Sequence, residues 1–597
     1  MTERSLRDEV RLAAPAPLTL RRALFFALVG TTIAALIGLL VVALSPGGFD
    51  AVDLVLVVLF AVTLPWYVIG FWNGVIGLCI MRFARDPVAT VMPTAARITG
   101  HEPIIASTAI LVCIRNEPVE RTASFLAPLL RGLAAHQSAA RFHVYILSDT
   151  DNPLIAAAED TQFAAVAQTL QGRLGITYRR RPTNAAFKAG NIRDFCERWG
   201  KDHDFAVVLD ADSVMTAEAV LRLVRIMQSE PRLGILQSLV AGLPSTSAFA
   251  RIFQFGMRLG MRSYTIGSAW WQGDCGPYWG HNAILRLVPF MAHCHIPPLP
   301  EDALVGGHVL SHDQVEAVLM RKAGYEVRVL PEEGASFEQN PPTLIEFIRR
   351  DLRWCQGNMQ YWHFLMLPGL RPISRYQLAF AILMFVGSPA WIGLLVIGTA
   401  AVALAGQPAA FIRADVGSVF FVLVLAMWFA PKIATVIDVL MRPALRRAFG
   451  GGVRFLASVG IETIFFILLS SIMWFGHTMF LGHLLVGRKL GWGGQARDDH
   501  VVAWSLAARQ LWPQTMLGLA TLTALAATVP SAIPYTLFIA GGLLLAIPFA
   551  VVTAMPAVGR ILLRLGLARM PEETTPGELA ELALPAIEAA AGLRRGD

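Results

Sequence analysis

Long apolar runs lie toward both ends of the chain, and a mixed polar segment separates them. The runs 23–44 and 54–80 are each long enough to cross about 30 Å of hydrocarbon as a helix. Further runs follow at 377–404, 416–440, 455–486, 516–529 and 536–552. Residues 82–375 contain no convincing span. The pattern therefore predicts a polar domain inserted between two groups of membrane helices.

Basic residues beside these runs predict their orientation. Arg21 and Arg22 precede the first run and Arg82 and Arg85 follow the second, which places both of these flanks in the cytoplasm. A cleaved signal peptide is the alternative for the first run, but the run is longer than a usual signal sequence and a second run follows at once. We therefore expect the polar domain and both termini on the cytoplasmic side.

The run at 455–487 is expected to begin and end in the cytoplasm, because basic residues flank it on both sides. These residues are Arg442, Arg446, Arg447 and Arg454 before or at its start, and Arg488, Lys489, Arg497 and Arg509 after it. At 1.5 Å per residue the run is short for two full spans, and it predicts a tight hairpin or a re-entrant pair. Counted as two, it gives about eight helical segments.

Four regions follow from this pattern. Residues 1–81 would hold a cytoplasmic N-terminus and two transmembrane helices, and 82–375 a cytoplasmic domain with interfacial helices. Residues 376–558 would form the C-terminal bundle of spans, and 559–597 a cytoplasmic tail.

Within the polar domain, short apolar runs alternate with stretches typical of helices. The runs 109–114, 142–147 and 205–210 are rich in β-branched and aromatic residues and end in polar turns, as buried parallel strands do. In an α/β sheet, ligands bind at the carboxyl ends of such strands. Polar side chains collect there: Arg115, Asn116 and Glu117 after the first strand, Asp149 after the second, and Asp210 and Asp212 after the third.

Composition supports a membrane protein and excludes other classes. Only 16% of the 597 residues are charged, and 55% are hydrophobic. The formal charge of +7 comes with basic residues beside apolar runs, so it indicates membrane orientation and not nucleic acid. The six cysteines form no CxxC pair, so neither a zinc ribbon nor a disulfide scaffold is predicted.

The strongest candidates for metal and nucleotide binding are carboxylates at strand ends. Asp210 and Asp212 could hold a divalent cation that also takes phosphate oxygens from a substrate. A D-x-D alone is a weak signal, and a solvated turn is the alternative. Asp149 could accept hydrogen bonds from a base or ribose, although an Asx turn explains an isolated Asp equally well.

Basic and aromatic motifs complete the candidate site. Arg179–Arg181 and Lys188 precede an expected helix and suit an anionic diphosphate, or form a solvated face. The loop WWQGDCGPYWGHN, from Trp270 to Asn282, could be a carbohydrate platform or a packed interfacial loop.

The later motifs are a carboxylate and a helix face. Asp313 is a candidate base or a first-turn carboxylate. Arg350, Arg353 and Trp354 share one helix face, either in a site or as part of an interfacial amphipathic helix.

In content and order, these motifs resemble those of the processive family 2 glycosyltransferases, which include cellulose and hyaluronan synthases. The familiar T-E-D reads Ser311, His312, Asp313 here, and Arg350 replaces the Gln of Q-x-x-R-W. The segments CIRNE, SHDQVEA and ARDDH resemble, more narrowly, the glucans biosynthesis glucosyltransferase H family, whose members make osmoregulated periplasmic glucans in the bacterial inner (plasma) membrane.

The resemblance implies a GT-A-type (Rossmann-like) cytoplasmic domain that transfers glucose from UDP-glucose with inversion, extending a β-1,2-glucan that the spans export. It implies Asp313, Arg353 and Trp354 as catalytic residues, with Asp313 the general base. The implied donor-binding residues are Arg115, Glu117, Asp149, Lys188, Asn191, Asp210 and Arg350. The implied acceptor-binding residues are Trp279, Gly280, His281 and Trp354, and Asp210 and Asp212 would hold Mg²⁺ (or Mn²⁺).

Partners implied by the resemblance are the lipid bilayer, the nascent glucan, acyl carrier protein and a periplasmic glucan biosynthesis protein, with no nucleic acid. Two alternative functions remain. One is synthesis of another β-linked polysaccharide, such as cellulose or hyaluronan. The other is a transporter with a nucleotide-binding domain, which the charged residues Lys432, Asp438 and Glu462 within the spans keep open.

Overall fold

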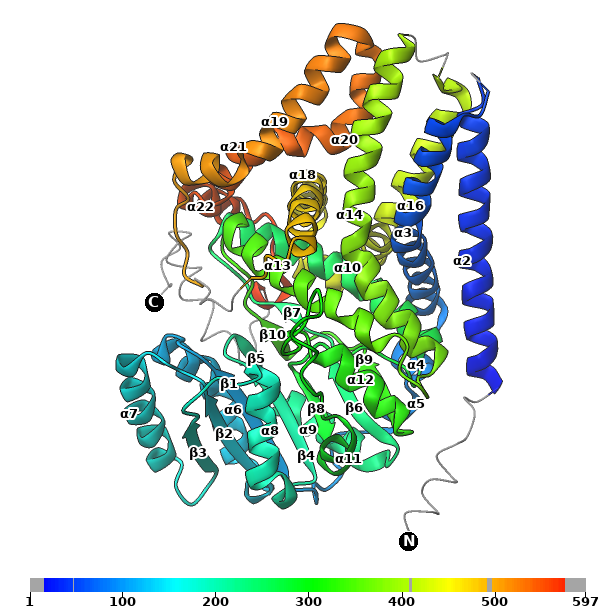
Figure 1. The fold of residues 1–597 in the computed structure, drawn as a ribbon. Helices are drawn as coiled ribbons and strands as arrows, with labels where there is room; N and C mark the ends of the chain where they lie inside the picture. Colours follow the sequence, from blue (N-terminus) through cyan, green and yellow to red (C-terminus); the bar gives the residue numbers. More distant parts are fainter. Residues whose placement is uncertain (1–15, 47, 407–410, 491–496, 575–597) are drawn as a thin grey trace.

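The computed structural model describes residues 16–46, 48–406, 411–490 and 497–574. Figure 1 shows an α/β domain at the lower end of the molecule and a group of long helices at the upper end. The outermost parts of the expected cytoplasmic N-terminus and tail, 1–15 and 575–597, lie outside the described residues.

A seven-stranded mixed, GT-A-like sheet forms the centre of the α/β domain, in the order β3-β2-β1-β4-β8-β6-β9. β8 is antiparallel to both of its neighbours, whereas the other pairings are parallel. The strands are β1 (Thr108–Ile114), β2 (Phe142–Ser148), β3 (Gly175–Arg180), β4 (Phe205–Asp210), β6 (Leu233–Ser238), β8 (Ala283–Arg286) and β9 (Glu326–Leu330). The three strands predicted from the sequence are β1, β2 and β4, and they are parallel as expected, with β1 between the other two.

Alternate residues of the central strands enter two apolar cores, because successive side chains of a strand point to opposite faces. Ile110 and Val112 pack with α6 (Val119–Ala135) and α9 (Ala217–Ser229). Ala109 and Leu111 pack with residues of α8 (Phe187–Trp199) and α12 (Asp313–Lys322). Both faces are thus covered, and the carboxyl ends of the parallel strands remain for the site. Phe163 of α7 (Pro153–Thr169) packs into the first core, and Leu287 and Phe290 of α11 (Leu287–His293) pack into the second.

A second, three-stranded sheet lies beside these strand ends, in the order β5-β10-β7. Its strands are β5 (Ser213–Met215), β7 (Ala241–Gly242) and β10 (Ser336–Glu338). From β10 the chain continues into α13 (Leu344–Met359), which Figure 1 shows between the α/β domain and the long helices.

Among the described residues, five helices are long and apolar enough to cross a membrane. They are α2 (Ala16–Ala43), α3 (Ala51–Phe83), α14 (Pro372–Ala405), α16 (Ala414–Met441) and α18 (Gly452–Leu485). A pair of helices bent by 59°, formed by 530–544 and 546–553, makes a sixth if it is one span. The expectation of about eight helical segments is therefore wrong. The run 516–529 is only the second half of α19 (Trp504–Thr528), whose first half carries Arg509, Gln510 and Gln514.

The predicted hairpin or re-entrant pair at 455–487 is also wrong, because α18 is one continuous helix across this run. α18 contains no proline, and none of its glycines has a positive φ, so nothing breaks the hydrogen-bond ladder. In Figure 1 α18 is seen nearly end-on, so it runs across the direction of α2, α3 and α14.

The polar domain contains a 25-residue helix, α10 (Ala248–Gln272), that the sequence did not reveal as part of the bundle. It packs closely against α3. A Cβ on Gly77 would lie 1.9 Å from the carbonyl oxygen of Ser263, and one on Gly267 would lie 2.0 Å from that of Asn73. Glycine at these two positions lets the backbones meet, and α10 thereby joins the α/β domain to the spans.

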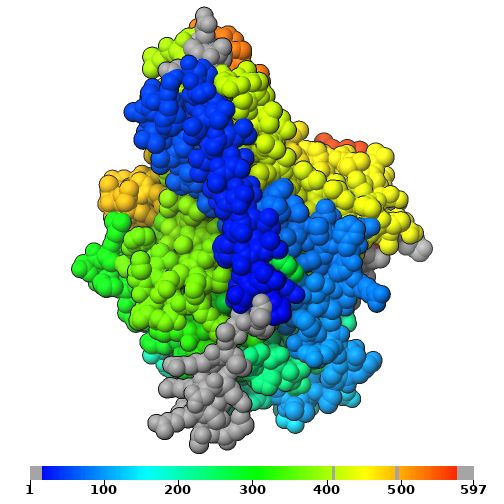
Figure 2. Space-filling model, turned by 90° about the vertical axis from the view of Figure 1, so that its right-hand side faces the viewer, coloured from blue at the N-terminus to red at the C-terminus, as the bar shows by residue number. Residues whose placement is uncertain are grey.

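The first helix covers the end of α10. Figure 2 shows α2 running along the outside of the molecule, from the bundle to the α/β domain. The ring of Trp271 stacks on that of Phe25 with centroids 4.2 Å apart, and the Arg21 guanidinium lies 5.4 Å from the ring of Trp270. These two tryptophans therefore belong to a packed interface and not to a carbohydrate platform.

The charged residues within the spans pair inside the protein. Lys432 of α16 forms an ion pair with Glu462 of α18. Asp438 pairs with Arg262 at 3.2 Å and with Arg442 at 2.9 Å. Ion pairs within the protein thus account for Lys432, Asp438 and Glu462, the residues on which the transporter alternative depended.

Candidate active site

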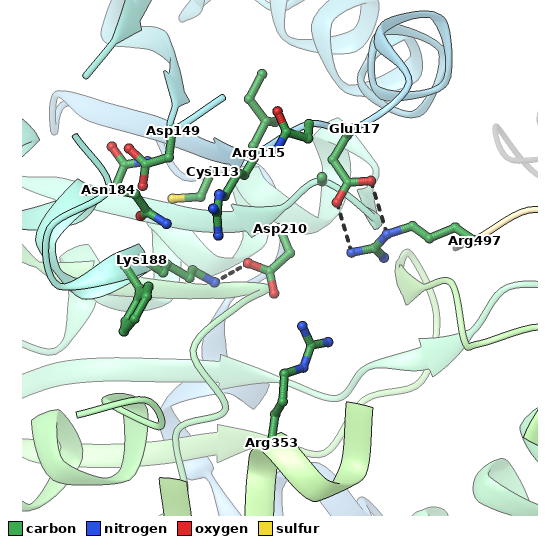
Figure 3. Close-up of a pocket in the computed structure, with 14 residues that line it drawn as sticks. Cys113, Arg115, Glu117, Asp149, Asn184, Lys188, Asp210, Arg353 and Arg497 are labelled. Atoms are coloured by element: carbon green, nitrogen blue, oxygen red, sulfur yellow. Dashed lines mark hydrogen bonds and ion pairs between the residues drawn. The ribbon is translucent and has the colours of Figure 1, made fainter. Parts of the chain in front are cut away.

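A pocket opens at the carboxyl ends of β1, β2 and β4 (Figure 3). Parallel strands bring residues distant in sequence to this one edge. Seven residues predicted to bind donor or act in catalysis line it together: Arg115, Glu117, Asp149, Lys188, Asn191, Asp210 and Arg353. Asp212 and Arg350 lie beside the pocket and are not among its lining residues.

Asp149 is buried and held by an arginine of the basic triplet. The Arg181 guanidinium donates to both Asp149 carboxylate oxygens at 2.7 Å. With its amide oriented to satisfy both neighbours, Asn184 also donates to Asp149 at 2.8 Å. Asp149 therefore has a fixed orientation at the wall of the pocket.

Asn191 lines the pocket, but its side-chain amide forms hydrogen bonds within the protein. Its Nδ2 donates to the carbonyl oxygen of Leu147 at 2.9 Å, and its Oδ1 accepts from Arg179 at 2.7 Å. Arg179 also pairs with Asp194 at 3.0 Å. These contacts fix the start of α8 against the end of β2, so Arg179 supports the pocket from behind.

Lys188, near the start of α8, points across the pocket to Asp210 at the end of β4. Its Nζ pairs with the Asp210 carboxylate and donates to the carbonyl oxygen of Gly280 at 2.8 Å. Burial alone would lower the pKa of Lys188, but the Asp210 carboxylate outweighs it and raises that pKa. Likewise, burial would raise the pKa of Asp210, but Lys188 holds it below its usual value. Both groups are therefore charged near neutral pH.

Arg497, from the segment after α18, was not assigned a role by the sequence. Its guanidinium pairs with Asp212. It also lies 3.2 Å from Glu117 (Figure 3). Burial alone would lower the pKa of Arg497, but the Asp212 and Glu117 carboxylates outweigh it and raise that pKa. Only the ARDDH motif marked this region, because 285 residues separate Arg497 from Asp212. Cys113, Asn184 and Phe187 also line the pocket and were missed.

The residues present fit a divalent cation shared with a substrate. Within the described ranges, no group of three or more His, Cys, Asp or Glu side chains could hold a metal ion alone. Asp210 and Asp212 supply hard carboxylate oxygens on either side of one turn, and such cations commonly complete their shell with phosphate oxygens and water.

Asp313, the predicted base, is the first residue of α12. The Tyr361 hydroxyl donates to its Oδ1 at 3.4 Å. Gly280 has φ +82°, and a Cβ there would lie 3.3 Å from the Asp313 Cβ. Glycine at this position thus lets the aromatic loop close over the base.

Directly before Asp313, His312 is buried and its Nδ1 lies 2.8 Å from Glu316 Oε2, one turn along α12. Burial alone would lower the pKa of His312, but the Glu316 carboxylate outweighs it and raises that pKa. The His of the S-H-D variant therefore braces the first turn of the helix.

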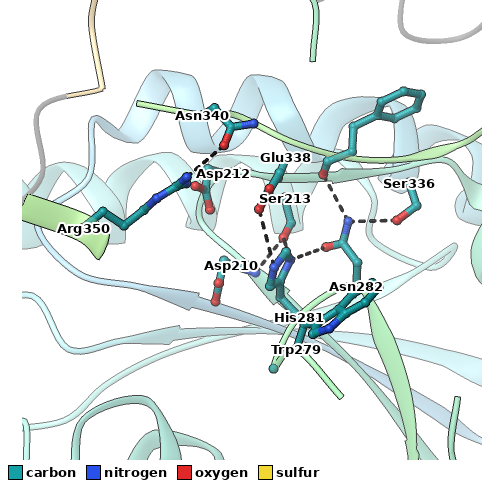
Figure 4. Close-up of polar contacts among 12 residues, drawn as sticks. Asp210, Asp212, Ser213, Trp279, His281, Asn282, Ser336, Glu338, Asn340 and Arg350 are labelled. Carbon is teal, nitrogen blue, oxygen red and sulfur yellow. Dashed lines mark hydrogen bonds and ion pairs between the residues drawn. The ribbon is translucent and has the colours of Figure 1, made fainter. Parts of the chain in front are cut away.

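Helix α13 carries the R-x-x-R-W residues toward the pocket. Arg353 lines the pocket, whereas the Arg350 guanidinium lies 4.7 Å from the ring of Trp354. Arg350 also donates to Asn340 Oδ1 at 2.9 Å (Figure 4). Burial lowers the pKa of Arg353, and Arg497 adds to this effect. The Trp354 side chain is 46% exposed, so its ring remains open to a ligand.

The aromatic loop contributes backbone and His281, and its Trp279 is partly packed. The Trp279 amide donates to Gln237 Oε1 at 2.8 Å, and its ring packs against the core. His281 Nε2 lies 3.5 Å from Glu338 of β10 (Figure 4). The loop thus links the two sheets beside Asp210.

Family models match this region. "Glycosyl transferase family 2" matches residues 109–293 and "Glycosyl transferase family group 2" matches residues 205–437. A solved structure, the mannosyltransferase PcManGT from Pyrobaculum calidifontis in complex with GDP-Man and Mn2+, is similar with a TM-score of 0.37 and 15% identity. That similarity covers 62% of this chain and 99% of that chain, and at this score it supports no conclusion.

Curated relatives match over most of the chain. Glucans biosynthesis glucosyltransferase H of Pseudomonas paraeruginosa is 34% identical to this chain over 87% of the chain's length. The matched region covers 62% of the length of that relative. The protein of the same name from Xanthomonas campestris pv. campestris is 33% identical over 96% of this chain and 92% of its own length. With that identity over nearly the full length of both, the chain belongs to the glucans biosynthesis glucosyltransferase H family.

Proposed function

We propose that this chain is an inverting, processive glucosyltransferase that uses UDP-glucose to extend the β-1,2-linked backbone of osmoregulated periplasmic glucans. The observation that carries this proposal is the pocket itself. There, Asp149 and Asp210 at the strand ends and Lys188 at the start of α8 line one pocket with Arg353 of α13, one residue before Trp354. Membership of a family of glucosyltransferases supports glucose as the transferred sugar.

Glucosyl transfer needs a general base for the acceptor hydroxyl and positive charge to stabilise the departing diphosphate. UDP-glucose is α-linked, so direct attack by an acceptor hydroxyl gives a β-glucoside and releases UDP. Asp313 would take the hydroxyl proton, a contribution of about 10²–10⁴ in rate. Lys188 and Arg353 would stabilise the departing diphosphate through charge-assisted hydrogen bonds. Mg²⁺ or Mn²⁺ held by Asp210 and Asp212 would neutralise diphosphate charge.

Acceptor binding falls to the exposed ring of Trp354 and to the loop at Trp279, Gly280 and His281. A sugar ring stacked on Trp354 would hold the terminal hydroxyl of the acceptor near Asp313. The fixed position and orientation of this hydroxyl would lower the entropic part of the activation barrier. Arg115, Glu117, Asn191 and Arg350 complete the proposed donor subsite.

Location and partners belong to the same proposal. The α/β domain and both termini would lie in the cytoplasm of a bacterium and the long helices in its inner membrane, with the product exported through the spans. The four regions 1–81, 82–375, 376–558 and 559–597 are proposed on this basis. Acyl carrier protein and a periplasmic glucan biosynthesis protein are proposed partners.

Product analysis tests the linkage. Nanodisc-held protein is given radiolabelled UDP-glucose and Mg²⁺, and the polymer is digested with β-1,2-specific or β-1,4-specific hydrolases. We expect only the β-1,2-specific enzyme to release label, and Asp313→Asn to make polymer about 10²–10⁴ times more slowly than the wild type. A product cut only by the β-1,4-specific enzyme would favour a cellulose-like synthase.

A further inference from the structure

Among the described residues between α18 and α19, Arg497 is the one that lines the pocket. Its side chain is 16% exposed, and its guanidinium pairs with Glu117, which follows β1 (Figure 3), and with Asp212, which follows β4. A basic side chain thus crosses from the membrane part of the chain into the nucleotide-binding end of the sheet.

The contact occupies an oxygen that the D-x-D motif would offer to a cation. Asp212 Oδ2 pairs with the Arg497 guanidinium. A divalent cation on the same carboxylate would stand within a few ångströms of the guanidinium, where two positive charges repel in a partly buried site. The guanidinium and the cation are therefore alternative partners of Asp212.

The chain around Arg497 is fastened to the α/β domain. Asp498 pairs with Arg121 of α6, and Asp499 accepts a hydrogen bond from Thr246. Gln339 Nε2 donates to the carbonyl oxygen of Arg497 at 3.4 Å. With its carbonyl group and the two residues after it held, Arg497 can exchange partners by rotating its side chain alone.

We propose that Arg497 is a donor-binding residue that holds the place of the cation at Asp212 until the nucleotide sugar enters, an inference that rests on the proposed function. On entry, Asp212 would release the guanidinium and Arg497 would turn to the diphosphate, whose oxygens it can bind with two parallel hydrogen bonds. A doubly charged cation and a doubly charged diphosphate add no net charge, so the exchange keeps the pocket balanced.

A consequence is that cation and donor enter together. In the resting protein, a cation arriving alone must displace a charge-assisted contact and gains no diphosphate in return. The bare cation therefore binds weakly, whereas the cation with a nucleoside diphosphate binds well. Removing Arg497 should change these two affinities in opposite directions.

The test measures binding without turnover, on full-length protein in nanodiscs. Mn²⁺ alone is followed by the electron paramagnetic resonance of free Mn²⁺, and UDP with Mn²⁺ by calorimetry. For Arg497→Gln we expect Mn²⁺ alone to bind about tenfold more tightly, and UDP about tenfold more weakly, since charge-assisted hydrogen bonds are of this size. Arg509→Gln, which removes an exposed arginine on α19, is the matched control and should bind both as the wild type does.

Arg497→Lys keeps the positive charge but cannot form the two parallel hydrogen bonds of a guanidinium. It is the second variant to measure if Arg497→Gln does not fold. We expect it to bind Mn²⁺ as weakly as the wild type and UDP more weakly. Two results would overturn this inference and leave the proposed function standing. One is that Arg497→Gln binds both ligands with wild-type affinity, and the other is that Arg509→Gln shows the affinity changes expected of Arg497→Gln. A wild type that binds no UDP with Mn²⁺ would overturn the proposed function as well.

Discussion

Both carboxylate oxygens of Asp149 are held at 2.7 Å by the guanidinium of Arg181. The two side chains are 5% and 9% exposed, so each charge depends on the other for solvation. The pair connects the end of β2 with the segment after β3, and it sets the orientation of the carboxylate that faces the pocket.

Arg181→Ala should therefore destabilise the protein strongly, because it leaves a buried carboxylate without its counter-charge. We expect a loss of about 3–5 kcal/mol, and a smaller loss in the double variant Asp149→Ala/Arg181→Ala. Thermal unfolding in detergent measures both. Arg193→Ala, which removes an exposed pair with Glu197, is the control and should cost about 1 kcal/mol or less. Equal melting temperatures for Arg181→Ala and Arg193→Ala would contradict this account.

Gly280→Ala should lower the kcat of synthesis, whereas its effect on stability should match that of a control glycine substitution. Its φ of +82° makes any side chain strained, by about 1–2 kcal/mol, and the added Cβ meets the Asp313 side chain. The control is Gly172→Ala, where φ is +78° and nothing lies within 4 Å of the added Cβ. We expect similar melting temperatures for the two variants and a lower kcat for Gly280→Ala only. A normal kcat in Gly280→Ala would argue against Asp313 as the base.

The His312–Glu316 pair predicts a pH dependence of stability. Because the folded state raises the pKa of His312, its contribution is fully present below the ordinary value of 6.5. It is lost as the pH rises through the folded-state value. We expect the melting temperature of the wild type to fall with this rise in pH, and that of His312→Gln to fall less.

Melting curves across this pH range, with His101→Gln as an exposed control, give the comparison. A wild-type pH dependence in His312→Gln would show that the imidazole does not carry the effect.

Trp354→Ala should impair use of the acceptor and spare the donor. An aromatic face contributes about 0.5–1.5 kcal/mol beyond buried area, so we expect up to about a tenfold rise in the KM for an oligoglucan acceptor. UDP binding should be unchanged. Trp362→Ala is the control, since Trp362 lies in the turn after α13 and is 68% exposed. The same KM change in both variants would mean that the effect is not stacking at the site.

The sequence predicted the inner strands and the residues at their ends because both follow from local pattern. Strands buried on both faces give short apolar runs, and parallel strands bring their polar ends together, so Asp149, Asp210 and Asp212 could be grouped in advance. Their partners could not. Arg181 was seen only as part of a basic triplet, and no spacing rule relates Arg497 to a carboxylate on β4.

The membrane part shows a similar limit. Hydropathy found the long apolar runs, but it does not give their direction. Basic residues on both flanks of 455–487 fit a segment that folds back, but they fit equally well a single helix that lies across the bundle, as α18 does. Helix α10 carries Arg251, Arg258 and Arg262, so its composition resembles a soluble helix although glycines pack it against α3.

The central claim is tested most directly by UDP release from purified protein in nanodiscs, given UDP-glucose and Mg²⁺, with Asp313→Asn and Asp212→Ala measured beside the wild type. We predict steady release by the wild type, a fall of about 10²–10⁴ in Asp313→Asn, and loss of release in Asp212→Ala. No release from UDP-glucose or other common UDP-sugars, with the proposed partners supplied, would contradict the assignment, as would a wild-type rate in Asp313→Asn.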